Sequence, residues 1–468
     1  MIVLTQKAAP LSNDLATPIS VFLEKVGPRG SGVLLESAEV GGRWGRHSVI
    51  AAGVLLKLSV RAGLLEVETA AESLAPLKKF AGLPYLTGLQ KVLASLTVRP
   101  DPAAPNLPTI TRALYGYLGH DAVSLAEESL IPYLPPARAE SAFILPASVF
   151  LFDHAFGKLT ELKLPGEPLK LEPLPLEAKG GGRQTSPSRE EYMELVRQAR
   201  DLIGEGELIQ LVLSVALDEP FAGAPLNLYR ALRRLNPSPY MFHMQLPELA
   251  LVVSSPEVLV SSAGDGLKLC PIAGTRPRGD TSAEDNLFEA ELVQNEKERA
   301  EHVMLVDLGR NDLGKVATPS SVEVERFMDV ERFSHVMHLT SHLKATLKPG
   351  LDAIDVLKAT FPAGTVSGAP KIRALELISR METSPRGPYA GGVGWFGLDK
   401  GSVDLDFGIT IRSAWIREGR VHCRAGAGIV FDSDPLSEWK ECLAKLAALT
   451  QALDEHRALE VSQNAASN

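Results

Sequence analysis

Residues 291–314 read ELVQNEKERAEHVMLVDLGRNDLG, and the rest of the chain is organised around this stretch. Its apolar residues recur at helical spacing with charged residues between them, so its first two-thirds is predicted to be an amphipathic helix. Glu298 and Glu301 are three residues apart and should project from one face of that helix. A second pair with the same spacing, Glu438 and Glu441, lies far downstream.

Two helices that each present a Glu-x-x-Glu edge can hold a hard cation between them. Magnesium prefers oxygen ligands and usually takes one or two carboxylates together with water and substrate oxygens. The spacing alone favours the alternative that both pairs are solvated helix faces, because charge on a helix surface is common. The other motifs of the chain decide between the two interpretations.

The composition is that of an ordinary water-soluble protein of 468 residues, 45% hydrophobic and 22% charged. The length allows two or three domains, or one large unit. The net charge of −9 argues against a general nucleic-acid binder, although a local pocket can still bind anions. The three cysteines, Cys270, Cys423 and Cys442, form no C-x-x-C pair, so neither a zinc ribbon nor a disulfide framework is expected. No secretory signal pattern and no long apolar run is present, so we expect a cytoplasmic protein that binds no membrane.

The chain is expected to have an N-terminal region over 1–164, a linker rich in Pro and Gly over 165–188, a C-terminal region over 189–456 and a frayed tail over 457–468. Strand patterns come in hairpin-like runs without strict β–α–β alternation, and no internal repeat is visible. We therefore predict an α+β fold with antiparallel sheets and helices packed outside.

Three strands are predicted near the C-terminal end, over 391–398, 406–416 and 420–430, followed by a last helix. Before them, residues 362–371 form a loop rich in Gly and Pro that opens another helix. Such a loop can point backbone N–H groups at an anion, and a simple tight turn is the alternative.

The part of the chain after residue 188 resembles the chorismate-utilising enzymes, and among them the large subunit (component I) of anthranilate synthases. The resemblance rests on nine motifs in order: SPE at 255–257, PIAGTRPRG at 271–279, EHVMLVDLGRNDLG at 301–314, SHVMHLTS at 334–341, FPAGTVSGAPKIRALE at 361–376, RGPYAGGVGW at 386–395, ITIRS at 409–413, AGAGIV at 425–430 and E-x-x-E-x-x-x-K at 438–445. The N-terminal region resembles the family more loosely, in LLES, GRWGRHS and GYLGHD. The resemblance implies two large, mainly antiparallel sheets with the active-site cleft between them.

The resemblance also implies roles for single residues. The metal ligands would be Glu298, Glu301, Glu438 and Glu441, around a Mg²⁺ that holds the ring carboxylate of chorismate. The clamp on the enolpyruvyl carboxylate would consist of Tyr389, Arg412 and the backbone of Gly426, Ala427 and Gly428. Thr275, Thr365, His338 and Lys445 would line the ring or its carboxylate. The planar fork of an arginine suits a carboxylate, and the alternative for Arg412 is a surface salt bridge on a strand.

In such a reaction ammonia attacks ring C2 while the 4-hydroxyl leaves. Hydroxide is a poor leaving group, so a general acid is needed, and Glu257 of the SPE motif matches it. Its pKa is then expected to be raised by the cleft. His338 is predicted to polarise the substrate, with a packed structural histidine as the alternative, and Thr275 completes the predicted catalytic set.

Two positions separate the branches of the family. Members that make aminodeoxychorismate typically carry Lys where this chain has Ala273, and isochorismate synthases carry a Lys base where it has Gln210, which cannot act as a base. Both residues favour ammonia attack at C2, with an aminodeoxychorismate synthase as the alternative. A non-catalytic tryptophan-sensing protein would be expected to lose acidic ligands, and none is lost.

The family strand VVLSQR reads LVLSVA here, which changes Val215 and Ala216.

The resemblance further predicts a partner and an inhibitor. None of the cysteines lies in a nucleophile elbow such as G-x-C-x-G, so the use of glutamine would require a separate glutamine amidotransferase subunit, whereas free ammonia would serve without one. Two segments resemble the tryptophan pocket of feedback-regulated anthranilate synthases, the enzymes of the first committed step of tryptophan biosynthesis. The pocket residues would be Ser37, Asn236, Pro239, Tyr240 and Met241. The alternative for the second segment is an ordinary N-P-S-P turn.

Overall fold

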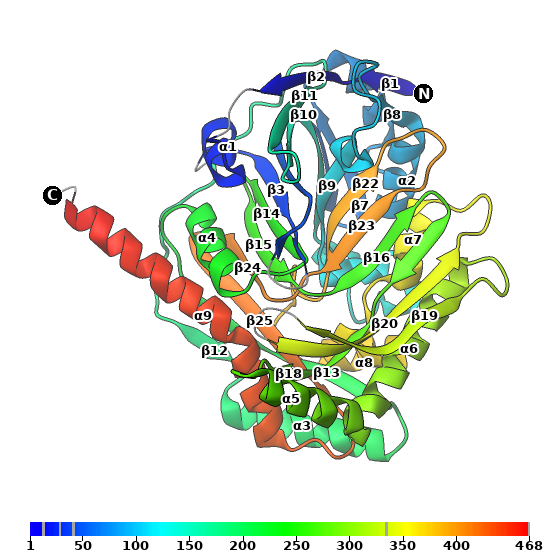
Figure 1. The fold of residues 1–468 in the computed structure, drawn as a ribbon, viewed down its shortest axis with the longest axis vertical. Coiled ribbons are helices and arrows are strands. Elements are labelled where there is room, and N and C mark those ends of the chain that lie inside the picture. Colours follow the sequence, from blue (N-terminus) through cyan, green and yellow to red (C-terminus); the bar gives the residue numbers. More distant parts are fainter. Residues whose placement is uncertain (12–14, 28–29, 40–42, 333–335, 467–468) are drawn as a thin grey trace.

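The computed structural model describes residues 1–468 except 12–14, 28–29, 40–42, 333–335 and 467–468. Strands form the interior of the molecule and helices cover its outside (Figure 1). The strand pairs of the large sheet are antiparallel, and the parallel pair joins β1 (Ile2–Thr5) to β8 (Leu96–Arg99). The prediction of an α+β fold with mainly antiparallel sheets is confirmed.

Two arms of sheet diverge from one central antiparallel pair, β6 (His47–Arg61) and β10 (Ser141–Asp153). The first arm continues from β6 in the spatial order β3 (Gly32–Glu36), β14 (Tyr240–Leu246), β15 (Leu249–Ser255), β24 (Ser413–Arg417), β25 (Arg420–Ile429) and β13 (Gln210–Pro220). The second arm continues from β10 in the order β9 (Ala113–Leu118), β22 (Gly392–Gly397), β23 (Leu405–Ile409), β16 (Val258–Ala263), β17 (Gly266–Leu269) and β20 (Val336–Thr346), and β20 also pairs with β18 (Ile272–Pro277) and β19 (Glu323–Arg332). Each arm begins with strands from before residue 164 and continues with strands from after residue 188, so the end of the expected N-terminal region does not separate two independent sheets.

The remaining strands extend the edges. They are β2 (Lys7–Leu11), β7 (Leu64–Thr69), β11 (Lys158–Lys163), β12 (Gln184–Ser186) and β21 (Gly368–Ala369). The short strands β4 (Ala38–Glu39) and β5 (Arg43–Trp44) form a separate two-stranded sheet. The expected linker has little regular structure apart from β12, which pairs with β13. This edge pairing fixes the path of the linker over the outside of the first arm.

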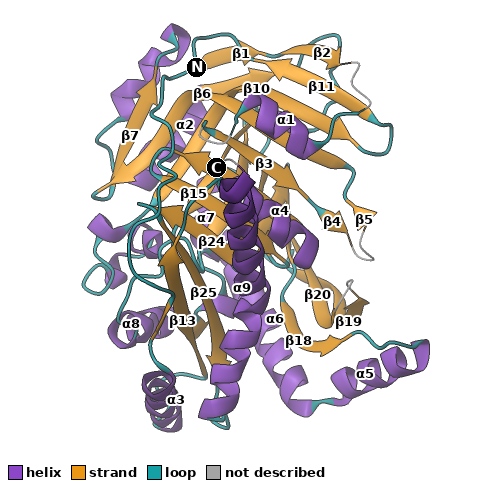
Figure 2. Cartoon of the chain, turned by 90° about the vertical axis from the view of Figure 1, so that its left-hand side faces the viewer, coloured by secondary structure: helices purple, strands orange, loops and turns teal. Residues whose placement is uncertain are grey.

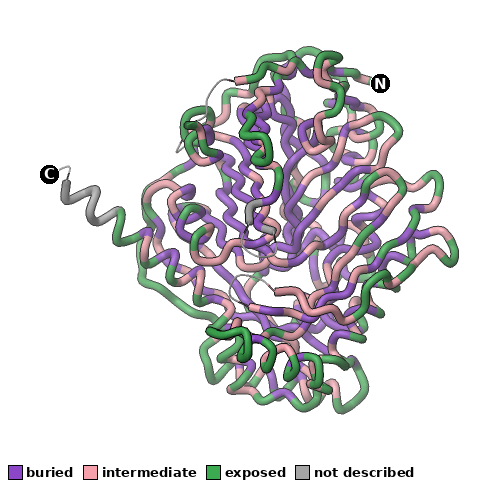
Figure 3. The backbone as a smooth tube through the Cα atoms, viewed as in Figure 1, coloured by how far each residue is buried: buried purple, intermediate pink, exposed green. Residues whose placement is uncertain are grey.

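The helices pack on the outer faces of the arms, with exposed residues on their outer sides, while the central strands of the arms are mostly buried (Figures 2 and 3). They are α1 (Pro18–Lys25), α2 (Tyr85–Ser95), α3 (Arg189–Gly204), α4 (Pro225–Leu235), α5 (Ser282–Gln294), α6 (Glu296–Val316), α7 (Ala353–Thr360), α8 (Lys371–Met381) and α9 (Pro435–Ala466). Helix α9 continues through Ala466, past residue 456 where the sequence predicts a frayed tail, and Arg457 forms an ion pair with the buried Glu219. In the part of the chain that the structure describes, no helix is long and apolar enough to cross a lipid bilayer.

The stretch 291–314 is divided between two helices. Helix α5 ends at Gln294, and the side chain of Asn295 accepts a hydrogen bond from the backbone N–H of Glu298, which caps the start of α6. Glu298 therefore lies in the first turn of α6, where the partial positive charge of a helix N-terminus stabilises a carboxylate. Glu301 follows one turn later, as the spacing predicts.

The chain passes between the two arms at two adjacent crossovers. Residues 256–257 lead from β15 to β16, and residues 410–412 lead from β23 back to β24. The single strand predicted over 406–416 is therefore wrong. Strand β23 ends at Ile409 and β24 begins at Ser413, and Arg412 between them adopts a φ of 49°, a left-handed conformation that a strand does not contain. The crossovers are joined by two backbone hydrogen bonds, from Ile409 N to Glu257 O at 2.9 Å and from Ser254 N to Arg412 O at 3.1 Å.

Candidate active site

A cavity of about 610 Å³ lies between the two arms, at the crossovers. Helices α6 and α9 contribute their Glu-x-x-Glu edges to its wall, and β13, β18, β20 and β25 contribute the rest of the lining strand residues. The predicted residues that line it are Glu257, Thr275, Glu298, Glu301, His338, Thr365, Tyr389, Arg412, Gly426, Gly428, Glu438, Glu441 and Lys445. The chain thus brings together thirteen of the fourteen residues predicted for catalysis, substrate binding and metal binding.

The exception is Ala427, whose side chain packs in a hydrophobic core beside Leu211 and Leu213. Successive side chains of a strand point to opposite faces, so Gly426 and Gly428 face the cavity and Ala427 faces away from it. Only the backbone of Ala427 is available to a ligand. The clamp predicted for Ala427 uses its backbone, so the burial of its side chain does not contradict that prediction.

The two glycines of β25 leave room for neighbouring polar groups. A Cβ atom on Gly428 would lie 2.5 Å from the amide nitrogen of Gln210, and one on Gly426 would lie 2.9 Å from the hydroxyl oxygen of Tyr389. Any larger residue at either position would displace these side chains. The glycines thus allow an amide and a phenol to reach the cavity wall.

Glu257 is buried at the first crossover, with 7% of its surface exposed. Burial raises the pKa of its carboxyl to about 8, against the opposing effects of the Thr365 hydroxyl, Lys445 and Arg412. The Thr365 oxygen has no partner with full hydrogen-bond geometry in the described part of the chain, so its effect on Glu257 is that of a nearby, poorly aligned donor. A carboxyl with this pKa keeps its proton at neutral pH, as expected of a general acid.

Arg412 lines the cavity, and its guanidinium group is available to a ligand. Across the described residues, no hydrogen bond or ion pair engages its guanidinium, and burial lowers its pKa although Tyr389, Glu441 and Glu257 favour the charged form. A guanidinium that is partly desolvated and unpaired attracts an anionic ligand. Tyr389 lies beside it, and burial raises the pKa of its phenol to about 12, so this hydroxyl remains a donor at neutral pH.

The four carboxylates of the Glu-x-x-Glu edges are partly neutralised by neighbouring groups. Glu298 pairs with Arg276 at 3.3 Å, and Glu441 pairs with Lys445 at 2.7 Å. Glu301 accepts a hydrogen bond from Gln210 Nε2 at 3.2 Å. Burial and then the negative charge of Glu298 raise the pKa of Glu301, and the pKa of Glu438 is also raised, first by burial. The carboxylates therefore repel one another, which is the electrostatic condition that a bound cation relieves.

In the described residues, no three or more His, Cys, Asp or Glu side chains stand in an arrangement that would hold a metal ion. The donor chemistry nevertheless fits a hard divalent cation, because all four acidic side chains offer oxygen atoms to one cavity. Magnesium needs only one or two of them directly, since water and substrate oxygens complete its coordination.

His338 lies on β20 with its Nδ1 atom 2.9 Å from the carbonyl oxygen of Gly274 and 3.1 Å from the hydroxyl oxygen of Thr275. A carbonyl oxygen can only accept, so Nδ1 carries the proton. Burial lowers the pKa of the imidazole, so the ring is neutral at neutral pH and its Nε2 atom is a base. The histidine predicted as catalytic is thus held in one tautomer on the cavity wall.

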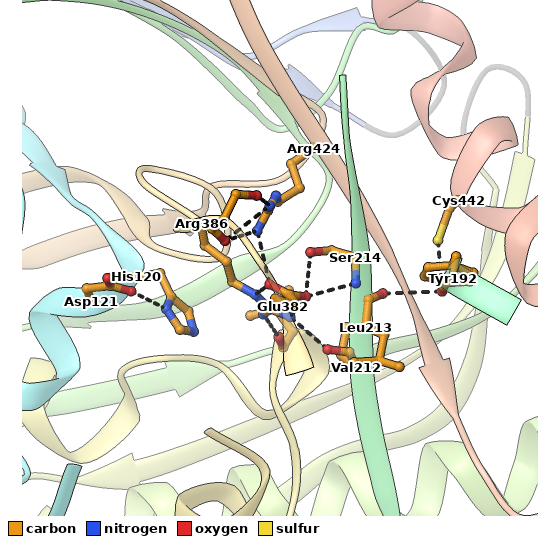
Figure 4. A network of polar contacts seen from close by, with 12 residues as sticks. His120, Asp121, Tyr192, Val212, Leu213, Ser214, Glu382, Arg386, Arg424 and Cys442 are labelled. Carbon is orange, nitrogen blue, oxygen red and sulfur yellow. Dashed lines mark hydrogen bonds and ion pairs between the residues drawn. The ribbon is translucent and has the colours of Figure 1, made fainter. Parts of the chain in front are cut away.

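Glu382, Arg386 and Arg424 form a network of ion pairs next to the cavity (Figure 4). Burial opposes ionisation of Glu382, but Arg386 and Arg424 outweigh it and lower its pKa to about 2. Arg386 also donates to the carbonyl oxygens of Val366 and Val212, two cavity residues. The sequence reasoning assigned no role to this network, although a charged residue such as Arg424, directly before the small and apolar residues AGAGI, is a signal for it.

Ser214 of the LVLSVA motif donates its hydroxyl to Glu382 at 2.6 Å, so this strand residue supports the same network. Val215 is fully buried in the core between β13, α3 and α8, and neither it nor Ala216 lines the cavity. The departure from the family strand motif therefore lies outside the wall of the cavity.

A second cavity of about 220 Å³ is lined by Ser37, Pro239, Tyr240 and Met241. These are four of the five residues predicted for a tryptophan pocket. Asn236 does not line it, because its amide nitrogen donates to Ser254 next to the first crossover. The cavity lies between the arms, since β3 and β14 form one side and β22 and β23 form the other.

Comparison of the chain with known proteins identifies a family and related proteins. The chorismate binding enzyme family matches residues 70–451 of the chain. Curated relatives named anthranilate synthase component 1 include those of Thermus thermophilus, 40% identical over 94% of this chain and 96% of the relative, and Aquifex aeolicus, 38% identical over 94% of this chain and 93% of the relative.

Solved structures share the fold. The crystal structure of anthranilate synthase component I from Streptococcus pneumoniae is similar with a TM-score of 0.70 and 31% identity, covering 87% of this chain and 92% of that one. A menaquinone-specific isochorismate synthase from Escherichia coli is similar with a TM-score of 0.72 over 96% of this chain and 94% of that one, and its 22% identity supports the fold alone.

Proposed function

The chain belongs to the chorismate binding enzyme family, and we propose that it is the component 1 subunit of an anthranilate synthase, which converts chorismate and ammonia to anthranilate, pyruvate and water. The observation that carries the proposal is a single cavity that combines a carboxyl of raised pKa, a guanidinium that no described residue engages and two acidic helix edges. These groups match a substrate with two carboxylates and a hydroxyl leaving group.

Chorismate carries one carboxylate on its ring and one on its enolpyruvyl group, and we assign the two to different parts of the cavity. Arg412 and the Tyr389 hydroxyl are the donors for the enolpyruvyl carboxylate, because no described residue engages the guanidinium and the phenol stays protonated. Lys445 donates to the carbonyl oxygen of Gly426 at 2.9 Å, and this bond keeps its ammonium group on the wall of the cavity.

The ring carboxylate is assigned to the acidic helix edges together with Mg²⁺. Glu298 and Glu301 from α6, and Glu438 and Glu441 from α9, are the residues that would hold the ion. Bound Mg²⁺ would neutralise these carboxylates and attract the ring carboxylate of the substrate. Arg276 and Lys445 balance part of the negative charge in its absence.

Glu257 supplies the proton for the leaving hydroxyl. Its raised pKa keeps the proton available at neutral pH, so water leaves instead of hydroxide as ammonia attacks C2. Neutral His338 also lines the cavity, and we assign to it the removal of the C2 proton when pyruvate leaves and the ring becomes aromatic. The Thr275 hydroxyl and the Gly274 carbonyl oxygen orient the imidazole for this step.

The branch of the family is assigned from the cavity wall beside the acidic edges. Ala273 places a methyl group there, and Gln210 an amide that donates to Glu301. Neither can act as a base that activates water or as a lysine nucleophile, so free ammonia is the attacking group. An aminodeoxychorismate synthase remains the second candidate, separable by its product.

Tryptophan is proposed to bind in the cavity lined by Ser37, Pro239, Tyr240 and Met241 and to inhibit the reaction. The apolar Pro239 and Met241 suit an indole ring, and the Ser37 hydroxyl can accept from an ammonium group. Inhibition requires that the ligand favours a state that binds chorismate poorly, and by reciprocity chorismate weakens tryptophan binding by the same factor.

The test is to incubate the purified chain with chorismate, Mg²⁺ and ammonium and to identify the product by fluorescence and mass. Anthranilate is expected, with no product when glutamine replaces ammonium unless a glutamine amidotransferase subunit is added. Glu257→Gln should slow product formation by about 10²–10⁴-fold, while Glu205→Gln, which changes an exposed residue at the end of α3, should leave it unchanged. Aminodeoxychorismate or isochorismate as the main product would overturn the proposal.

A further inference from the structure

A third, very small cavity of about 20 Å³ adjoins the substrate cavity at Glu257. Glu257 and Thr365 border both cavities, and the far wall of the small one is formed by Asp312 and Thr360 with apolar neighbours from α6 and β17. A cavity needs roughly 10–15 Å³ to hold a water molecule. The small cavity therefore has room for one.

The polar groups around this cavity suit a water molecule. The Thr365 hydroxyl is buried and has no hydrogen-bond partner in the described part of the chain. The Thr360 hydroxyl donates to the carbonyl oxygen of Val356 and keeps a lone pair that can accept. With the carboxyl groups of Glu257 and Asp312, a water here would have the two to four partners that buried waters usually make.

Asp312 connects the small cavity to solvent through two lysines. Its buried carboxylate lies 2.6 Å from the Nζ atom of Lys371 and 3.1 Å from that of Lys315. The Lys371 side chain is 11% exposed, and burial lowers its pKa although Asp312 opposes this effect. The Lys315 side chain is 50% exposed, so its ammonium group exchanges protons with bulk water.

The proposed reaction leaves Glu257 without its proton, which it has given to the departing hydroxyl. The substrate cavity then holds the products, beside Arg412 and Lys445. The thiol of Cys270 lies nearby, and burial raises its pKa. The small cavity is the second side from which a proton can reach the carboxylate.

We propose that Asp312 and a water in the small cavity return a proton from Lys371 and Lys315 to Glu257 after each turnover. The Asp312 carboxylate first takes a proton from the Lys371 ammonium group. It then gives this proton to the water, which passes one of its own to Glu257, and Lys371 recovers a proton from solvent beside Lys315. No atom or electron is gained or lost in the cycle. This relay rests on the proposed function, since it serves the general acid of that reaction, and Asp312 acts in it as a positioning residue without touching the substrate.

The experiment compares the first turnover with the later ones in Asp312→Asn, by stopped-flow fluorescence of anthranilate with the full chain, Mg²⁺ and ammonium. Glu257 begins protonated, so the first turnover should keep the wild-type rate, and later turnovers should be slower by about tenfold or more because the proton returns slowly. The trace should show a burst of about one product per chain. Imidazole, a small diffusible acid, should speed the later turnovers without changing the burst.

Two variants control for folding and position. Asp307→Asn removes an exposed carboxylate on the same helix that pairs with Arg310, and it should show no burst. The double variant Asp312→Asn with Lys371→Met leaves no unpaired buried charge, and it should show the burst again.

Equal slowing of the first and later turnovers in both Asp312 variants would overturn the relay and make Asp312 a purely structural residue. Unchanged steady-state turnover would overturn it as well. A wild-type chain that forms no anthranilate would instead contradict the proposed function, so the two failures are distinct.

Discussion

Replacing Glu257 by Gln should remove a pH-dependent loss of stability together with the activity. Burial raises the pKa of this carboxyl from its ordinary 4.5 to about 8, so the folded protein binds the proton more tightly than the unfolded chain does. Stability is then complete below the unfolded pKa and falls as pH rises from about 4.5 towards 8. Between about pH 5 and about pH 9 the loss amounts to about 4 kcal/mol, since each pKa unit is about 1.4 kcal/mol.

Gln has nearly the same shape as Glu but no proton to lose, so the variant lacks this loss. The free energy of unfolding is measured by urea denaturation at both pH values for the two proteins, with the four tryptophans as the fluorescent probe. The wild type should lose about 4 kcal/mol more than Glu257→Gln between the two conditions. Comparing the change with pH, instead of the stability itself, cancels the difference in burial cost between a carboxyl and an amide.

The exposed Glu205→Gln serves as the control, since it should leave the wild-type pH dependence unchanged. In parallel, kcat of Glu257→Gln should fall by about 10²–10⁴ with little change in KM, as expected for loss of a general acid. The loss of stability between the two pH values is compared for Glu257→Gln and wild type. If the two losses differ by less than about 1 kcal/mol, Glu257 ionises normally in the fold, and its role as the acid is refuted.

Three further outcomes follow from the site. Arg412→Lys should raise KM for chorismate by about 10–100-fold, because a point charge replaces a guanidinium that can form paired, charge-assisted hydrogen bonds, and an unchanged KM in steady-state kinetics would contradict the clamp. Glu301→Gln should weaken Mg²⁺ binding, measured by calorimetry on the chain without substrate, and the same affinity as wild type would exclude this residue as a ligand. Ser37→Phe should fill the second cavity and abolish inhibition by millimolar tryptophan while kcat stays near wild type, whereas equal sensitivity of mutant and wild type would place the inhibitor elsewhere.

The acidic edges were predictable because they depend on local spacing. Residues three apart on one helix share a face wherever that helix lies, so the side on which Glu298 and Glu301 project needed no knowledge of the fold. The pairing of α6 with α9 across one cavity is a tertiary fact, and here the resemblance to a known family supplied what the spacing could not. The break at Asn295 was missed, although an Asn followed three residues later by Glu is a common start of a helix.

Arg412 shows where sequence patterns stop being informative. Its neighbours read as one continuous strand, and nothing in their alternation indicates the left-handed φ of 49° that separates β23 from β24. The conformation is maintained by contacts with another part of the chain, including the bond from Ser254 N to Arg412 O. Local strain of this kind costs about 1–3 kcal/mol and is found where the surrounding structure requires it. A strained arginine with an unpaired guanidinium is therefore an indication of a binding role that only the structure provides.

The two crossovers also connect the substrate cavity to the second one. Tyr240, at the start of β14, donates to Asp406 of β23 at 2.7 Å, and this bond joins the first arm to the second inside the second cavity. In register, Tyr240 lies opposite Ser255, two residues before Glu257, and β23 leads directly into the turn that holds Arg412. A ligand that separates Tyr240 from Asp406 would shift the arms relative to each other, and both the acid and the carboxylate clamp would move with them. Because sub-ångström changes in a packed interface are amplified at such junctions, an inhibitor in this cavity needs no contact with the substrate to change its affinity.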